Sequence, residues 1–156
     1  KGAQNALAVE FRVALSAITN VALFIGLTDQ NAALEMPIQA SGVGDGITTN
    51  AADAVGVMFD TSMATDNWWL VGVAANVDAT AQNSAVAPSA NVFERWRIEV
   101  TTAGVATFFR NGVAIGTAMT AAITAATTLT PVIAAFSRAA ASRNVQADFI
   151  DTRAKR

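Results

Sequence analysis

Carboxylates are the first side chains to consider for chemistry, because the 156-residue chain contains no His, Cys or Tyr. Without these residues it has no thiol nucleophile, no imidazole base and none of the commonest zinc ligands. Glycoside hydrolysis would need two carboxyl groups flanking one bond. The glutamates are isolated, and Glu94 and Glu99 fall on opposite faces of any regular strand. The full set is Glu10, Glu35, Glu94 and Glu99. We therefore expect no enzyme and assign no catalytic residue.

Calcium is the one metal that the acidic side chains of this sequence could still bind. Asp60 and Asp66 fall in one expected loop, and Asp78 and Asn83 fall in another. Neither loop has the ligand spacing of a known calcium loop. Because Asp and Asn side chains commonly cap turns, their presence needs no ion. We expect no metal or other cofactor, with calcium as the alternative.

The pair Trp68-Trp69 could serve recognition. Adjacent residues of a strand point to opposite faces, so only one of the two rings can enter a given core. The other ring could stack on a sugar, contact a partner protein or pack beneath a long loop. Packing is the favoured interpretation, and glycan or partner contact is the alternative.

Composition narrows the class of protein further. Hydrophobic residues make up 53% of the chain and charged residues 14%, with 10 basic against 12 acidic side chains. This balance is typical neither of a disordered chain nor of a nucleic-acid binder. The longest apolar runs fall far short of the roughly 20 residues of a membrane span, and no signal-peptide-like run follows the N-terminus. We expect a soluble, processed or excised segment that binds neither nucleic acid nor membrane.

Alternation of apolar and polar residues predicts β-strands. Every odd position from 7 to 15 is a large apolar residue, and the run 21–28 repeats the pattern after a turn at 17–20, so the two are expected to pair as neighbours. Asn111-Gly112 is the strongest hairpin signal. The other predicted strands are 55–59, 68–76, 94–101, 105–110, 113–117, 131–137 and 145–151.

Two long connections, at about 29–53 and 77–92, separate these strands. Long irregular segments in a compact domain are usually functional or covered by a partner. Strands 68–76 and 131–137 are apolar on both faces, which also indicates a cover. The long loops could provide it, but neighbouring subunits are favoured. The expected assembly contacts in the first loop are Leu34, Met36, Ile38 and Ile47.

The segments 93–100 and 104–112 resemble the hairpin of the concanavalin A-like lectin/glucanase superfamily, which includes laminin-G-like domains. In that hairpin a Trp-x-x-apolar strand precedes a strand ending in an aromatic pair and Asn-Gly, and residues 145–150 resemble the closing strand. The hairpin and core markers are Trp96, Phe108, Asn111, Gly112 and Phe149. The resemblance implies a single all-β domain over residues 1–156, a two-sheet antiparallel jelly-roll sandwich. The Glu-x-Asp-x-x-Glu run of the superfamily's glycosidases is absent.

A second resemblance bears on function. The segments 10–12, 24–29 and 54–60, with the Ala/Thr-rich and charge-poor texture, are similar to structural proteins of tailed bacteriophages. This implies a non-enzymatic capsid decoration or cement subunit on the virion surface, which binds capsid protein or other virion subunits and forms a homo-oligomer or lattice. The alternative is a carbohydrate-binding module of an adhesin or tail fibre.

Overall fold

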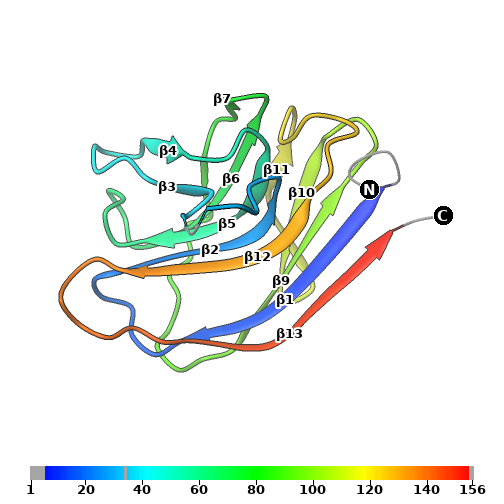
Figure 1. The fold of residues 1–156 in the computed structure, drawn as a ribbon. Helices are drawn as coiled ribbons and strands as arrows, with labels where there is room; N and C mark the ends of the chain where they lie inside the picture. Colours follow the sequence, from blue (N-terminus) through cyan, green and yellow to red (C-terminus); the bar gives the residue numbers. More distant parts are fainter. Residues whose placement is uncertain (1–5, 34, 155–156) are drawn as a thin grey trace.

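Antiparallel β-strands form two facing sheets in the computed structural model, which describes residues 6–33 and 35–154 (Figure 1). The fold is an all-β, two-sheet antiparallel jelly-roll sandwich, as the sequence predicts. The strands are β1 (Leu7–Leu15), β2 (Val21–Thr28), β3 (Ile38–Ala40), β4 (Ile47–Thr49), β5 (Ala54–Asp60), β6 (Trp68–Ala74), β7 (Val77–Asp78), β8 (Gln82–Asn83), β9 (Glu94–Val100), β10 (Ala106–Arg110), β11 (Val113–Met119), β12 (Thr130–Ser137) and β13 (Val145–Ala154). The described ranges contain no helix of the length and apolarity needed to span a bilayer.

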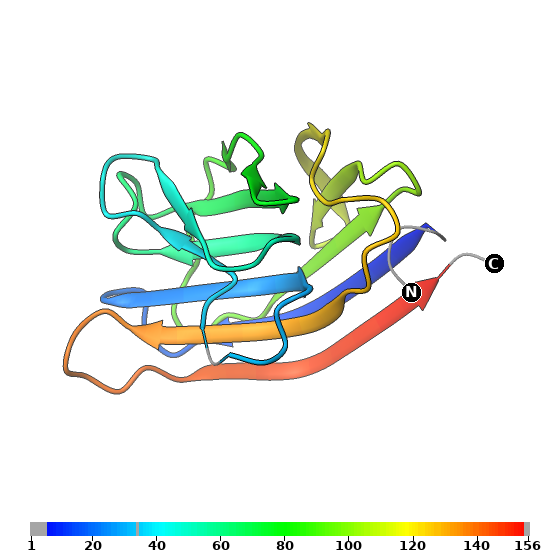
Figure 2. The same cartoon turned by 45° about the horizontal axis from the view of Figure 1, so that its top comes forward.

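Consecutive parts of the chain contribute strands to both sheets. The first sheet has the order β11-β10-β9-β1-β13, and the second has the order β12-β2-β5-β6-β7, with β8 also paired to β6. Strands β3 and β4 form a separate two-stranded ribbon (Figure 2). The first and last long strands therefore lie side by side in the first sheet, and the second and penultimate long strands lie side by side in the second sheet.

Residue alternation places the main core between the sheets. In β1 the residues Val9, Phe11 and Val13 are buried, while Glu10 and Arg12 lie on the outer face. Strand β9 repeats this arrangement with Trp96 and its apolar neighbours turned inward. The period-2 pattern thus predicted which face of each strand enters the core.

One predicted pairing is wrong. Strands β1 and β2 do not pair; β1 pairs with β9 and β13, and β2 pairs with β5 and β12. The segment 16–20 crosses from one sheet to the other instead of closing a hairpin. Alternation determines the face that a strand buries but not its neighbour, and here the apolar faces of β1 and β2 meet across the interior.

A second core covers the outer face of the second sheet. Every residue of β2 is buried, with Leu23 and Ile25 in the main core, and Ala22 and Phe24 in this second core. The ribbon and the residue Met36 just before it supply the cover, because Met36, Ile38 and Ala40 pack against the sheet. The chain's own loop therefore covers the outer apolar face of β6, which corrects the expectation that neighbouring subunits would do so.

Candidate interaction surface

Both residues of the tryptophan pair are interior. Trp68 and Trp69 are 2% and 3% exposed. The Trp68 ring lies 5.3 Å from that of Trp96 in an edge-to-face contact within the main core. Trp69 lies in the second core, and its Nε1 donates a hydrogen bond to the carbonyl oxygen of Thr65. Neither ring is available to stack on a sugar or a partner, so the glycan-contact interpretation is corrected and the packing interpretation holds.

Tryptophan fluorescence tests this burial. Because Trp68, Trp69 and Trp96 are all buried, we expect blue-shifted emission with little quenching by acrylamide until the protein is unfolded in denaturant. Monosaccharides at millimolar concentration should leave the emission unchanged. Strong quenching of the folded protein would contradict the placement of at least one of the three rings.

Four of the five hairpin and core markers lie where the sequence predicts. Trp96 and Phe108 are fully buried. Asn111 and Gly112 form the turn between β10 and β11 with φ values of 50° and 86°. The Asn111 side-chain oxygen also accepts a hydrogen bond from the backbone N–H of Arg95 at 2.9 Å, which ties the turn to β9.

Phe149 is the exception, because it lies on the outer face of the first sheet. The register of β13 against β1 shifts by one residue between Arg12 and Val13, so that Phe149 is opposite Arg12 and Ile150 is opposite Phe11. A one-residue shift in register exchanges the two faces of a strand. Without this irregularity Phe149 would face the core, and its prediction as a core marker is therefore corrected.

The expected assembly loop is packed against its own sheet. Met36 and Ile38 are fully buried, and Ile47 is half-buried against the second core. Leu34 lies outside the described residues. The apolar residues of this loop thus fasten the ribbon, and the expectation that Met36, Ile38 and Ile47 form a free contact surface is corrected.

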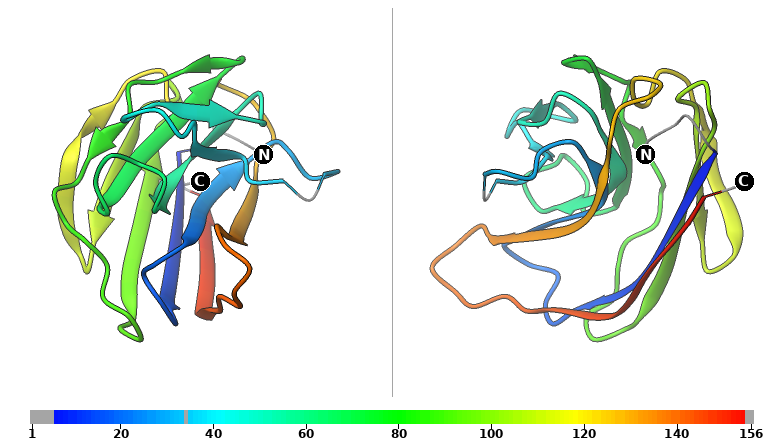
Figure 3. Two further views of the ribbon diagram at one scale, coloured as in Figure 1. Left: turned by 90° about the vertical axis from the view of Figure 1, so that its left-hand side faces the viewer. Right: turned by 45° about the vertical axis from the view of Figure 1, so that its right-hand side comes forward.

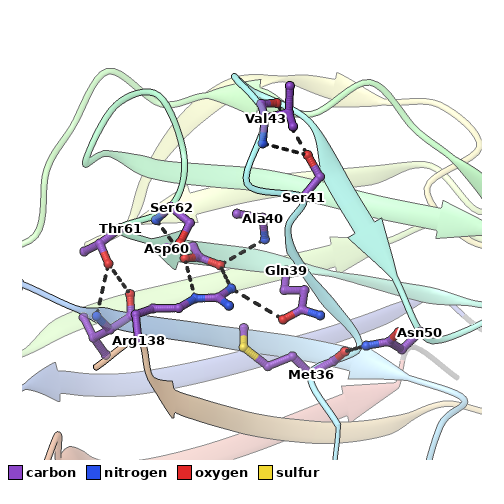
Figure 4. A network of polar contacts seen from close by, with 11 residues as sticks. Met36, Gln39, Ala40, Ser41, Val43, Asn50, Asp60, Thr61, Ser62 and Arg138 are labelled. Atoms are coloured by element: carbon purple, nitrogen blue, oxygen red, sulfur yellow. Dashed lines mark hydrogen bonds and ion pairs between the residues drawn. The ribbon is translucent and has the colours of Figure 1, made fainter. Parts of the chain in front are cut away.

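A buried carboxylate holds the ribbon in place (Figure 4). Asp60, at the end of β5, is fully buried and forms an ion pair with Arg138, which follows β12. Its two oxygens also accept hydrogen bonds from the backbone N–H groups of Ala40 and Ser62, each at 3.0 Å. Arg138 further donates to the side-chain oxygen of Gln39. This network joins the ribbon, β5 and the end of β12, and it gives Asp60 a structural role.

Two of the other candidate calcium ligands, Asp78 and Asn83, also form hydrogen bonds within the chain. Asp78 accepts a hydrogen bond from the Thr49 hydroxyl at 2.9 Å, and Asn83 accepts from Asn67 at 3.0 Å. Among residues 6–33 and 35–154 no group of three or more His, Cys, Asp or Glu side chains is arranged to hold a metal.

Three carboxylates gather on the outer face of the first sheet, a cluster that sequence reasoning missed. Glu10, Glu99 and Asp151 line one hollow of about 330 Å³ together with Arg97 and Arg153. Arginines lie beside all three carboxylates: Arg95 is 3.3 Å from Glu10, Arg97 is 3.4 Å from Glu99, and Arg153 is 2.6 Å from Asp151. The cluster depends on how β1 aligns with β9 and β13, which no local pattern indicates. Its paired charges suit binding of a polar molecule better than proton transfer.

The two long sides of the sandwich differ. On one side β8 meets β11, where Gln82 donates to the Thr117 carbonyl and accepts from the Thr117 backbone N–H. These bonds bridge the two sheets and close that side.

On the opposite side, β12 and β13 are the edge strands of their sheets, and they diverge from each other (Figure 3). Neither strand contains a single buried residue. The register places Ile150, Thr152 and Ala154 of β13 opposite Phe11, Val9 and Leu7, so they point toward the interior yet are exposed. We call this side, formed by β12 and β13, the open side.

The two strands that border the open side carry exposed apolar and aromatic residues. Ile150 is 46% exposed, and Phe136 and Phe149 on the outer faces of β12 and β13 are 42% and 37% exposed. At the end near the C-terminus, a hollow lies between the edges, lined by Leu7, Leu27, Leu129, Pro131, Thr152, Arg153 and Ala154. At the other end, Arg143 lies in the segment that connects β12 to β13, and its Nε donates a hydrogen bond to the carbonyl oxygen of Thr19. The open side is the candidate interaction surface.

The fold and this surface define a β-sandwich with one closed and one open side. No protein-family model matches the sequence, and no curated protein is significantly similar to it.

Proposed function

We propose that this protein is a non-catalytic assembly subunit that docks through its open side. The observation that carries the proposal is the pair of edge strands, β12 and β13, that contain no buried residue although their neighbours β2 and β1 are largely interior. Edge strands with free backbone groups and apolar side chains are templates for pairing with another chain. A surface of this kind commonly marks a protein contact.

The setting we propose is a virus particle. The resemblance to structural proteins of tailed bacteriophages suggests a capsid decoration or cement subunit, with capsid protein or sister subunits as partners. The charge-poor composition supports this setting, because charged residues are depleted at the centre of protein–protein interfaces. Detection of this chain by mass spectrometry in purified particles, at a stoichiometry matching the capsid lattice, would support the setting. Its absence from particles of the virus that encodes it would refute the setting.

The docking surface itself can be tested by placing a charge on each side of the molecule. Ile150→Asp puts a carboxylate in the middle of the open side. We expect it to weaken self-association or capsid binding about tenfold or more, because burying an unpaired charge in an interface costs more than the roughly 1.4 kcal/mol that corresponds to a factor of ten. Sedimentation velocity and capsid co-sedimentation measure the effect.

Val113→Asp is the matched control, because Val113 is 71% exposed on β11, the far edge of the same sheet. It should leave both kinds of binding unchanged. Thermal melts of both variants separate loss of binding from loss of folding. Equal effects of the two substitutions would contradict docking through the open side.

A carbohydrate-binding role is the second candidate, and the hollow with Glu10, Glu99 and Asp151 favours it. Carboxylate and guanidinium groups beside small apolar residues such as Ala8 are a surface on which sugar hydroxyls find hydrogen-bond partners. A thermal-shift screen against a glycan panel tests this role. A shift that is lost in Glu99→Ala would favour it, and no shift with any glycan would reject it.

A further inference from the structure

We propose that β13 pairs with β13 of a second copy of this chain, antiparallel and about a two-fold axis at Thr152. The inference rests on the proposed function, since it names the partner at the open side. Such pairing would join the two five-stranded sheets into one continuous sheet across the dimer.

The shape of β13 limits where a second copy can pair. Its first half contains the irregularity opposite Arg12 and Val13, which interrupts the regular spacing of backbone groups. From Phe149 to Ala154 the strand is in unbroken register with β1, and its other edge has no partner among the described strands. This second half has no proline and is therefore a regular template for an added strand. The axis must lie within it.

The register places two carboxylates side by side on the outer face of this half. Asp151 is directly opposite Glu10 of β1, and like charges in that position repel each other. Glu10 is engaged by Arg95, whereas Asp151 is paired with Arg153 of its own strand, whose side chain is 79% exposed. A cation on the free edge beside Asp151 would offset the repulsion, and Arg153 of a second copy can supply it.

The position of the axis follows from this charge pattern. An axis at Thr152 places Asp151 of each copy opposite Arg153 of the other, so that two complementary pairs form. The same axis places Ile150 opposite Ala154 on the inner face, beside the apolar hollow at the end of the open side. An axis at Asp151 or at Arg153 would place identical charges opposite each other. An axis at Ile150 would place Arg153 opposite Ala147, inside the irregular half.

Charge exchange tests the pairing. Arg153→Asp and Asp151→Arg should each weaken dimerisation about tenfold or more, because each turns two attractive cross-strand pairs into repulsive ones. The double variant Asp151→Arg/Arg153→Asp restores both pairs and should return the dimer dissociation constant to within about threefold of the wild type. The single variants change net charge in opposite directions, so a general charge effect could not weaken both.

A cross-link tests the axis directly. The chain has no cysteine, so Thr152→Cys introduces one thiol that would lie opposite its own copy, within disulfide reach. Oxidation with diamide should convert most of this variant to a covalent dimer, whereas Val113→Cys on the far edge should give only slow, concentration-dependent cross-linking.

The outcomes separate the two proposals. Association of the wild type that Ile150→Asp weakens, combined with no rescue by the double exchange and no cross-linking of the Thr152→Cys variant, would overturn the β13 pairing and keep the docking function. A wild type that is monomeric at millimolar concentration and binds no capsid would overturn both proposals.

Discussion

Asp60→Ala is expected to lower the free energy of unfolding by about 3–5 kcal/mol, the usual cost of removing one partner from a buried ion pair. The Asp60 side chain is fully buried, and it is bonded to Arg138 and to two backbone N–H groups. Its loss leaves those donors without their acceptor, and the N–H of Ala40 lies in a buried residue where an unmet hydrogen bond is costly. Urea denaturation followed by circular dichroism measures the effect.

Asp148→Ala is the matched comparison. Asp148 also forms an ion pair with an arginine, Arg12, but both side chains are more than 40% exposed. Exposed pairs contribute about 0–1 kcal/mol, because water screens the charges and solvates either partner alone. We therefore expect Asp148→Ala to be nearly neutral. Similar losses in the two variants would contradict the view that Asp60 is a buried anchor of the ribbon.

The long range of the Asp60 contact explains why sequence reasoning described this residue as a turn capper. Asp60 does accept a hydrogen bond from Ser62 two residues along, which is the local interaction that a loop aspartate predicts. Its ion-pair partner Arg138 lies 78 residues away in the sequence. Only the order of strands in the second sheet, where β12, β2 and β5 are neighbours, brings the two together.

Local sequence patterns correctly predicted which face of β1 and β9 is buried. Trp96 and Phe11 are core residues because alternation within a strand is a property of the backbone itself. The turn at Asn111-Gly112 followed from the ability of these residues to adopt positive φ. Such features need only a few neighbouring residues and no knowledge of the fold.

Features that depend on strand pairing could not be predicted in this way. The shift in register that turns Phe149 outward arises between β1 and β13, at opposite ends of the chain. Met36 and Ile38 are apolar residues in a polar loop, a pattern equally typical of an exposed contact and of a buried anchor. They are buried because they pack on the outer face of β5 and β6, which would otherwise be exposed. The open side likewise becomes visible only when both edge strands are placed.

Trp96→Ala is expected to lower the free energy of unfolding by about 3–5 kcal/mol through lost burial and the cavity that remains. The ring is fully buried between the sheets and in edge-to-face contact with Trp68. The substitution removes apolar contacts from both sheets. The surrounding strands cannot move in to fill the cavity, because backbone hydrogen bonds to their neighbours hold them in place. Chemical denaturation monitored by far-ultraviolet circular dichroism measures the loss.

Two further variants show whether burial is the cause. Phe149→Ala removes an aromatic ring that is 37% exposed, so it should cost about 1 kcal/mol or less, in line with surface substitutions. Trp96→Phe keeps an aromatic ring and removes Nε1, which is buried without a hydrogen-bond partner. Because that unpaired group disappears, the loss of volume is partly offset and the cost should fall well below that of Trp96→Ala. Equal costs for Trp96→Phe and Trp96→Ala would contradict the view that filling of the core accounts for the contribution of this residue to stability.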